Sequence, residues 1–293
     1  MPTSPLNSRT VRLSTLFLSL FLLFLGLQSC QRQEDLYFRR SHSEVAPAEE
    51  LAELLVQGSF RHYQGSPSHQ LVLREALHHN PNSALVNREL GVAYLKRGYA
   101  NEFPRYYGRA AELDPTTWIG WRGYFYLYFY RDYQRAIEDF NALDTLTPNV
   151  IDHPQSQSVD YMRGIAYHQL GDYNFAHYFL NKHLEFEAEH GGGRYTSSVA
   201  YLMHALNWRA LQNNTKALEV LDLALSWGSR MADLHYYRAL ILYEEGRLPE
   251  ARAALDKARQ GYTEDWYHER AYVEEFYQVY PEDFDALEEK FNG

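Results

Sequence analysis

The sequence predicts an all-α fold, a solenoid of about six helix pairs with a C-terminal capping helix. Two spacings predict it. Prolines that end helix-like runs are 34 and 33 residues apart, at Pro81, Pro115 and Pro148. Alanines in similar settings are 40, 41 and 34 residues apart, at Ala136, Ala176, Ala217 and Ala251. Self-similarity at a period of about 20–50 residues indicates stacked copies of one supersecondary unit.

Small residues strengthen the pattern, because one stands twelve or thirteen positions before each alanine, at Gly123, Gly164, Ala205 and Ala239. Small side chains at these two places allow the paired helices to cross closely, and proline ends the second helix because it cannot continue the hydrogen-bond ladder. The predicted units are 50–83, 84–117, 118–150, 157–190, 198–231 and 232–265. The first unit is degenerate, as a capping repeat often is.

The stretch "RGIAYHQLGDYNFAHYFL" resembles the consensus of the tetratricopeptide repeat, a unit of about 34 residues. It places Gly164, Gly171 and Ala176 in the small-residue slots and Tyr167 and Leu180 in the large apolar ones. The stretch "RELGVAYLKRGYANEFPRYYGRAAELDP" also fits, except that Phe103 stands where the family usually has alanine. The resemblance implies a right-handed superhelical solenoid of about six helix pairs over residues 47–265.

Residues 1–29 have the character of a signal peptide. Arg9 and Arg12 precede an uncharged apolar run of 15 residues, Leu13–Leu27. This run is shorter than the roughly 20 residues that a membrane-spanning helix needs, and it suits a cleaved signal segment. The run ends in "LQSC", and the cysteine, Cys30, is the only one in the chain.

The "LQSC" string resembles the lipobox of bacterial lipoproteins. In that family the cysteine thiol receives a diacylglyceryl group, the chain is cut before the cysteine, and the new amine is acylated. The resemblance therefore implies a lipid anchor on Cys30 and a lipidated tether over residues 30–46. Gln31 follows the cysteine in place of Asp, which by the same resemblance favours an outer-membrane lipoprotein. Whether the protein faces the periplasm or the exterior stays open.

The stretch "GYFYLYFYRDYQRAIEDF" at 123–140 is aromatic at nearly every position from Tyr124 to Tyr130. A membrane-barrel strand would alternate polar and apolar residues, and a barrel needs many such segments. This run neither alternates nor recurs. We therefore expect the first helix of the third unit here, with "RDY" as the turn and "QRAIEDF" opening the second helix.

The resemblance also implies a binding surface. In tetratricopeptide repeats one stripe of each first helix lines the concave face, and Tyr, Trp and Arg are common anchors in recognition surfaces. The alternative is that these side chains pack between repeats. The predicted partner-binding residues are Arg88, Trp121, Phe125, Tyr128, Tyr161, His168, Arg209, Tyr236 and Tyr243.

Two spacings exceed 34 residues, and the extra residues are expected in loops at 152–158 and 190–196. The acidic tail, residues 266–293, is expected to form C-terminal capping helices, one longer and one shorter.

Several chemistries are excluded or not indicated. The net charge of −10 argues against nucleic acid as the main partner, and a single cysteine excludes intrachain disulfides and thiolate metal cages. The string His190–Gly193 matches an esterase loop, but the Gly-x-Ser-x-Gly elbow of that fold does not occur. We therefore expect no enzyme activity, no cofactor, and no catalytic or metal site.

The expected function is that of a membrane-anchored scaffold in the bacterial cell envelope that binds a protein or peptide partner. The alternative is capture of a glycan or small molecule through an aromatic concave groove in a nutrient-uptake system.

Overall fold

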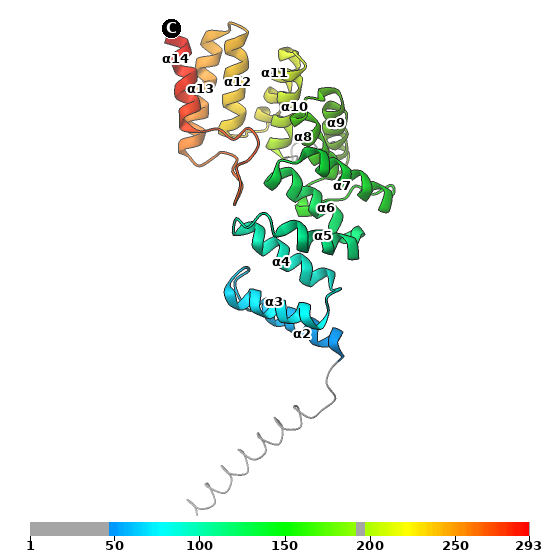
Figure 1. Ribbon diagram of the computed structural model, residues 1–293. Coiled ribbons are helices and arrows are strands. Elements are labelled where there is room, and N and C mark those ends of the chain that lie inside the picture. The colour runs from blue at the N-terminus through cyan, green and yellow to red at the C-terminus, as the bar shows by residue number, and fades with distance from the viewer. Residues whose placement is uncertain (1–46, 192–196, 293) are drawn as a thin grey trace, which may run out of the picture.

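The computed structural model describes residues 47–191 and 197–292 (Figure 1). The predicted signal peptide, Cys30 and the tether lie outside the described residues, as does most of the 190–196 loop. All regular structure in the described part is helical, as predicted. No helix there is long and apolar enough to cross a membrane.

Six helix pairs stack one after another in chain order and form an elongated, curved array (Figure 1). We number them as the first to the sixth unit. The pairs are α2 (Ala48–Ser59) with α3 (Pro67–His79), α4 (Ala84–Lys96) with α5 (Phe103–Leu113), α6 (Pro115–Phe125) with α7 (Tyr133–Leu146), α8 (Val159–Gln169) with α9 (Tyr173–His190), α10 (Ser198–Ala210) with α11 (Asn214–Ser226), and α12 (Ala232–Glu244) with α13 (Leu248–Thr263). The predicted fold of about six helix pairs is confirmed.

Helix starts are set by local side chains. Ser83, Asp132, Asp172 and Asn213 each stand just before a helix, and each accepts a hydrogen bond from a backbone N–H in its first turn. Such caps satisfy donors that the helix itself leaves unpaired. These polar residues therefore fix where the four helices begin.

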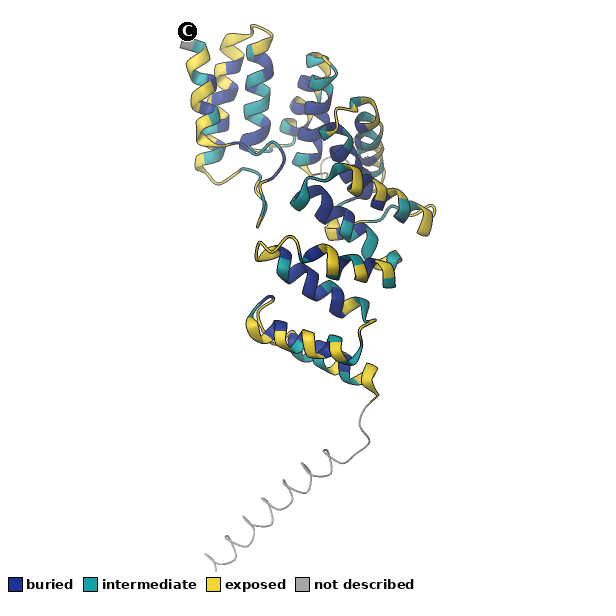
Figure 2. Cartoon of the chain, viewed as in Figure 1, coloured by how far each residue is buried: buried dark blue, intermediate teal, exposed yellow. Residues whose placement is uncertain are grey.

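The small residues lie where the paired helices cross. A Cβ added at Gly164 would lie 2.7 Å from Leu180 Cγ, and one added at Gly123 would lie 2.7 Å from Phe140 Cε1. The four recurrent alanines have no exposed surface, namely Ala136, Ala176, Ala217 and Ala251. Close crossing explains the period seen in the sequence. Figure 2 shows the buried residues on the faces that the helices turn to one another.

The third unit departs from its neighbours at the aromatic run. Its first helix, α6, continues into a π-helical turn, η1 (Tyr126–Tyr130), and Arg131 then adopts a left-handed conformation with φ of 54°. A π-helical turn accommodates one more residue than an α-helical turn. The predicted helix is correct, and the turn after it comprises Arg131 and Asp132, because Tyr133 already belongs to α7.

Of the two capping helices predicted for the tail, the first is absent and the second is present. Residues 264–280 form neither helix nor strand, and α14 (Pro281–Asn292) is the one helix that follows α13 in the described chain. We call residues 264–280 the strap. It leaves α13, runs out from the sixth unit toward the middle of the array and returns to α14 (Figure 1). Helix formation is overridden here by contacts with the concave face.

Candidate functional site

The concave face, predicted as an open binding groove, is largely occupied by the strap. The tip of the strap reaches the second unit, where Lys96 Nζ lies 5.1 Å from the ring centroid of Tyr272. Its two ends stay at the sixth unit, because α13 and α14 flank it. The strap therefore spans the groove from the sixth unit to the second.

Arg270 of the strap contacts the aromatic run directly. Its guanidinium lies 3.6 Å from the ring centroid of Tyr128, and Nη1 donates to Tyr124 Oη at 2.6 Å. Arg270 Nε also donates to Glu275 Oε2 at 2.6 Å within the strap. A cation over a tyrosine face is attracted by the ring quadrupole, so the third unit holds a socket for an arginine.

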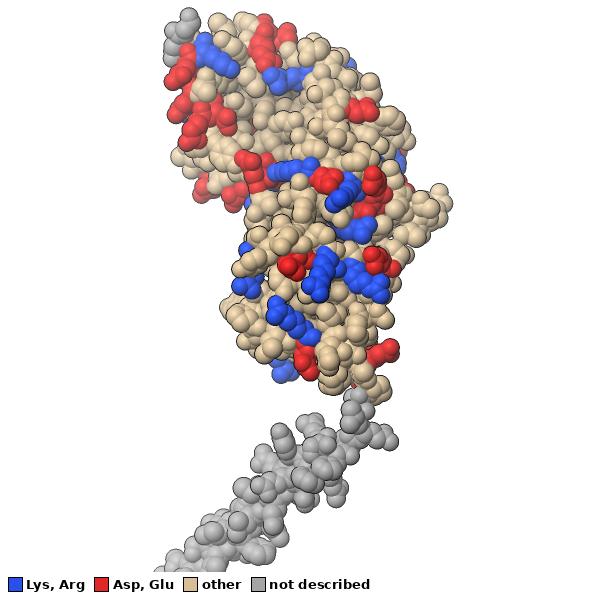
Figure 3. Space-filling model, viewed as in Figure 1, with Lys and Arg blue, Asp and Glu red and all other residues tan. Residues whose placement is uncertain are grey.

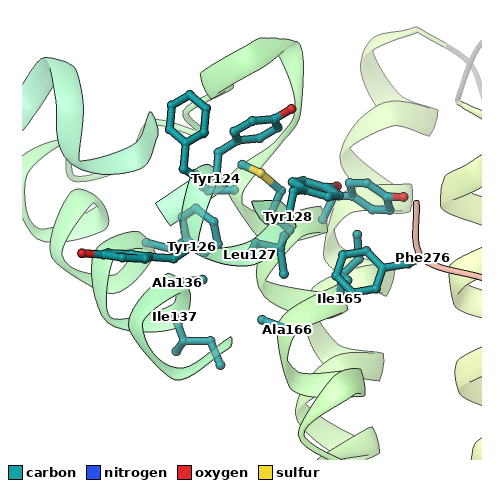
Figure 4. Packing of buried hydrophobic residues seen from close by; sticks show 14 of the residues in the cluster. Tyr124, Tyr126, Leu127, Tyr128, Ala136, Ile137, Ile165, Ala166 and Phe276 are labelled. Atoms are coloured by element: carbon teal, nitrogen blue, oxygen red, sulfur yellow. The ribbon is translucent and has the colours of Figure 1, made fainter. Parts of the chain in front are cut away.

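Phe276 of the strap inserts beside this socket. Its ring centroid lies 5.5 Å from that of Tyr128, and Arg131 stacks over it at 3.9 Å. The side chain is nearly buried and belongs to the hydrophobic core of the middle units. Figure 4 shows Phe276 beside Tyr128 and Ile165, on a segment that comes from the C-terminal end of the chain. Arg131 also donates to the Glu274 carbonyl.

Tyr277 joins the strap to the fourth and fifth units. Its hydroxyl lies 2.7 Å from His168 Nε2, and His168 Nδ1 lies 2.9 Å from Asn207 Oδ1. Burial lowers the pKa of His168, which keeps the ring neutral. In a neutral ring Nδ1 donates to the amide oxygen of Asn207 and Nε2 accepts from the Tyr277 hydroxyl. The tyrosine ring packs against both large core clusters.

Asp233 at the start of α12 fixes the first part of the strap. Its Oδ2 accepts from the backbone N–H of His268 at 2.9 Å, and its side chain has no exposed surface. Burial raises the pKa of Asp233 to about 6, and the backbone donors partly offset this rise. The backbone N–H of Ala232 also donates to the Trp266 carbonyl at 2.6 Å, so polar contacts hold the strap near both of its ends.

The nine predicted residues fall into three groups. The strap contacts Tyr128 and His168, and Tyr128, Phe125, Tyr161 and His168 are all buried. Helix α14 packs on the sixth unit, where Tyr236 contacts Phe284 and Tyr243 contacts Phe291. The remaining three, Arg88, Trp121 and Arg209, are half-buried, as Tyr236 and Tyr243 are. The structure therefore brings the predicted stripe together on one face but covers most of it.

Three strap residues that fill the groove were not predicted from the sequence, namely Arg270, Phe276 and Tyr277. All three lie in the tail that was expected to be helical. The available signal was their chemistry, because arginine and aromatic side chains are common anchors of recognition surfaces.

Two parts of the concave side remain open. In the second and third units the Arg88 guanidinium lies between two tryptophans, 5.4 Å from the Trp118 ring and 5.5 Å from the Trp121 ring. Beside the strap a hollow of about 580 Å³ is lined by Tyr173, Tyr277 and other side chains. Arg209 and Glu244 form a two-bond ion pair at its rim.

The visible face carries no continuous basic patch that would bind a polyanion. Figure 3 shows basic and acidic side chains interspersed over the middle of the visible face, with acidic ones gathered near the C-terminal end. Within residues 47–191 and 197–292 no group of three or more His, Cys, Asp or Glu side chains is placed to hold a metal ion. What the described face offers chemically is aromatic stacking and hydrogen bonding.

The chain is similar in fold to solved tetratricopeptide-repeat proteins. Neither the family models nor the curated proteins give a significant match to the sequence. Among solved structures it is similar to PilW, a widely conserved type IV pilus biogenesis factor, with a TM-score of 0.58 and 13% identity over 72% of this chain and 94% of that chain. PilF of Pseudomonas aeruginosa gives a TM-score of 0.56 and 16% identity over 74% and 94%.

A third similar structure is a chain of the APC/C hetero-tetramer Cut9–Hcn1, with a TM-score of 0.53, 14% identity and coverage of 76% of this chain and 42% of that one. At these identities the likeness concerns the fold. The six stacked pairs and these neighbours together show that the chain has the all-α tetratricopeptide-repeat superhelix.

Proposed function

We propose that the protein is a scaffold of the bacterial cell envelope, anchored in the membrane through lipidated Cys30, whose solenoid binds a protein or peptide partner. One observation carries the proposal: the concave groove accommodates an irregular polypeptide segment through aromatic, ionic and hydrogen-bonding contacts. A groove with this chemistry suits an extended polypeptide, and this favours the scaffold over the alternative of glycan capture.

The anchor is tested with Cys30→Ala in cells fed a labelled fatty acid. The variant should lose the label and leave the membrane fraction, while Ser29→Ala, which keeps a small residue before the cysteine, should retain both. Several acyl chains give a stable anchor where one is marginal. A Cys30→Ala protein that stays membrane-bound through high-salt washing would refute lipid anchoring.

The partner is tested by affinity capture from detergent-solubilised envelopes, followed by calorimetry with the purified candidate. We expect a protein that binds directly with one defined stoichiometry. A glycan array probed with the same protein examines the alternative. Saturable glycan binding without any direct protein binding would overturn the scaffold proposal.

A further inference from the structure

The strap is unusual in length and path. It comprises the seventeen residues 264–280 between two helices. Loops longer than about 12–15 residues without secondary structure are uncommon in compact domains, and many are functional lids or binding loops. Both ends of the strap lie at the sixth unit, while Tyr272 at its tip reaches Lys96 of the second unit.

The strap contacts the groove as a bound peptide would. The anchors are side chains placed in separate sockets, Arg270 over Tyr128 and Tyr277 against His168, with Phe276 between them. Pockets that each take one side chain of an extended segment are a recurring way of recognising peptides.

Two features of the strap lower the stability of its docked conformation. Arg270 and Glu275 form a nearly buried ion pair, with side-chain exposures of 14% and 3%, and desolvation offsets most of the attraction in such pairs. Tyr272 and Tyr277 have φ values of 75° and 59°, in the left-handed region that side chains other than glycine rarely adopt. A competing segment free of this strain has an advantage.

Release of the strap does not require the solenoid to open. Helix α14 is held independently, because Phe284 and Leu287 are buried against the sixth unit. With α13 and α14 in place, residues 264–280 can leave the groove as a loop tethered at both ends.

We propose that the strap is an internal ligand of the partner-binding groove and that the partner displaces it with an extended segment of similar chemistry. Such a segment carries an arginine for the Tyr124–Tyr128 socket and an aromatic pair six and seven positions later, as Arg270, Phe276 and Tyr277 do. An acidic residue beside the aromatic pair neutralises the arginine, as Glu275 does. The inference rests on the proposed function, because it takes this groove as the binding surface.

The test adds a labelled synthetic peptide with the sequence of residues 264–282 to the full chain in detergent. A tethered strap competes with it at a high effective concentration. The variant Arg270→Ala/Phe276→Ala should therefore bind the peptide at least about tenfold more tightly than the wild type. Glu269→Ala, at an exposed position of the strap, is the control and should behave as the wild type. A peptide with the same two alanines should not bind. Equal affinities for all three proteins, or no binding to the double variant, would overturn the proposal.

A second measurement tests the proposal on the wild type and therefore does not depend on the folding of the double variant. Amide hydrogen exchange of the wild type should show residues 268–279 opening more readily than α12 and α14. Protection of the strap equal to that of these helices would mean that it is a fixed part of the core, and the proposal would fail. Neither measurement uses the natural partner or the lipid anchor, so the result is independent of the capture experiment and of Cys30→Ala.

Discussion

At the scale of single residues, several histidines of the described chain are buried, His69 among them. His168, His183 and His204 are each less than a tenth exposed, and burial lowers the pKa of all three. His204 shows the effect most clearly. Its ring stacks on His177 at 5.2 Å, and burial together with this neighbour lowers the pKa of His204 to about 4.

These shifts predict a loss of stability in mild acid. In the unfolded chain a histidine takes up its proton near pH 6.5, whereas His204 in the fold does so only near pH 4. The unfolded state therefore binds more protons between these values, and the stabilisation present above pH 6.5 is lost as the pH falls. For His204 the full shift corresponds to about 3 kcal/mol.

Urea unfolding at pH 7.5 and pH 4.5 measures this loss. His204→Phe should show a smaller difference in the free energy of unfolding between the two pH values than the wild type, since it has no proton to gain there. A difference as large as that of the wild type would assign the acid sensitivity to other groups.

At the scale of elements, the close helix crossings explain why the repeats could be read from the sequence. Gly164 faces Leu180 across the α8–α9 crossing, and a Cβ there would meet Leu180 Cγ at 2.7 Å and the Leu180 backbone nitrogen at 3.2 Å. By contrast, a Cβ on Gly108 in the middle of α5 would meet nothing within 4 Å. Gly164 therefore has no room for a larger side chain, whereas Gly108 has.

Substituting alanine at these two glycines should change the melting temperature in opposite directions. Gly164→Ala should destabilise by about 1–3 kcal/mol, because the crossing has no room for the added carbon. Gly108→Ala should stabilise by up to about 1 kcal/mol, because alanine costs less backbone entropy in a helix. Thermal unfolding of both variants is the measurement, and equal shifts of the same sign would contradict the crossing geometry.

The fold was predictable where local chemistry fixes it. Proline and small crossing residues act within one unit, so the six pairs and the turn after the aromatic run were predictable from the sequence. The path of the strap was not predictable, because residues 264–280 contain neither glycine nor proline. Gly261 and Pro281 only flank this segment. Their conformation depends on sockets such as Tyr128 and His168, more than a hundred residues away in the chain.

The candidate site was predictable in part, because the repeat pattern fixes which residues share the concave face. The concave stripe follows from the repeat phase, so Tyr128, Tyr161 and His168 were placed on one face. The strap contacts of Tyr128 and His168 could not be inferred, since they come from a segment outside the repeats. The sequence of one repeat does not show which distant segment of the chain packs on its surface.

At the scale of the whole molecule, the strap gives the solenoid a closure that its repeats alone do not supply. Repeat arrays are stabilised mainly by contacts between neighbouring units. Here Tyr277 packs against the core clusters of the middle and the C-terminal units, and Arg131 of the third unit donates to Glu274. The strap therefore couples units that lie far apart in the array, and its release would loosen that coupling as it opens the groove.

For the strap to act as an internal ligand, it must lie in the concave groove of the free protein. Spin labels on Lys96→Cys and Tyr272→Cys test this most directly, in a Cys30→Ala background that removes the chain's one native thiol. Both sites are exposed, and their side chains meet with 5.1 Å between Lys96 Nζ and the Tyr272 ring centroid. We predict strong dipolar broadening between the labels in the full chain, and its loss in Arg270→Ala/Phe276→Ala. A wild-type spectrum without broadening would place the strap outside the groove and contradict the account.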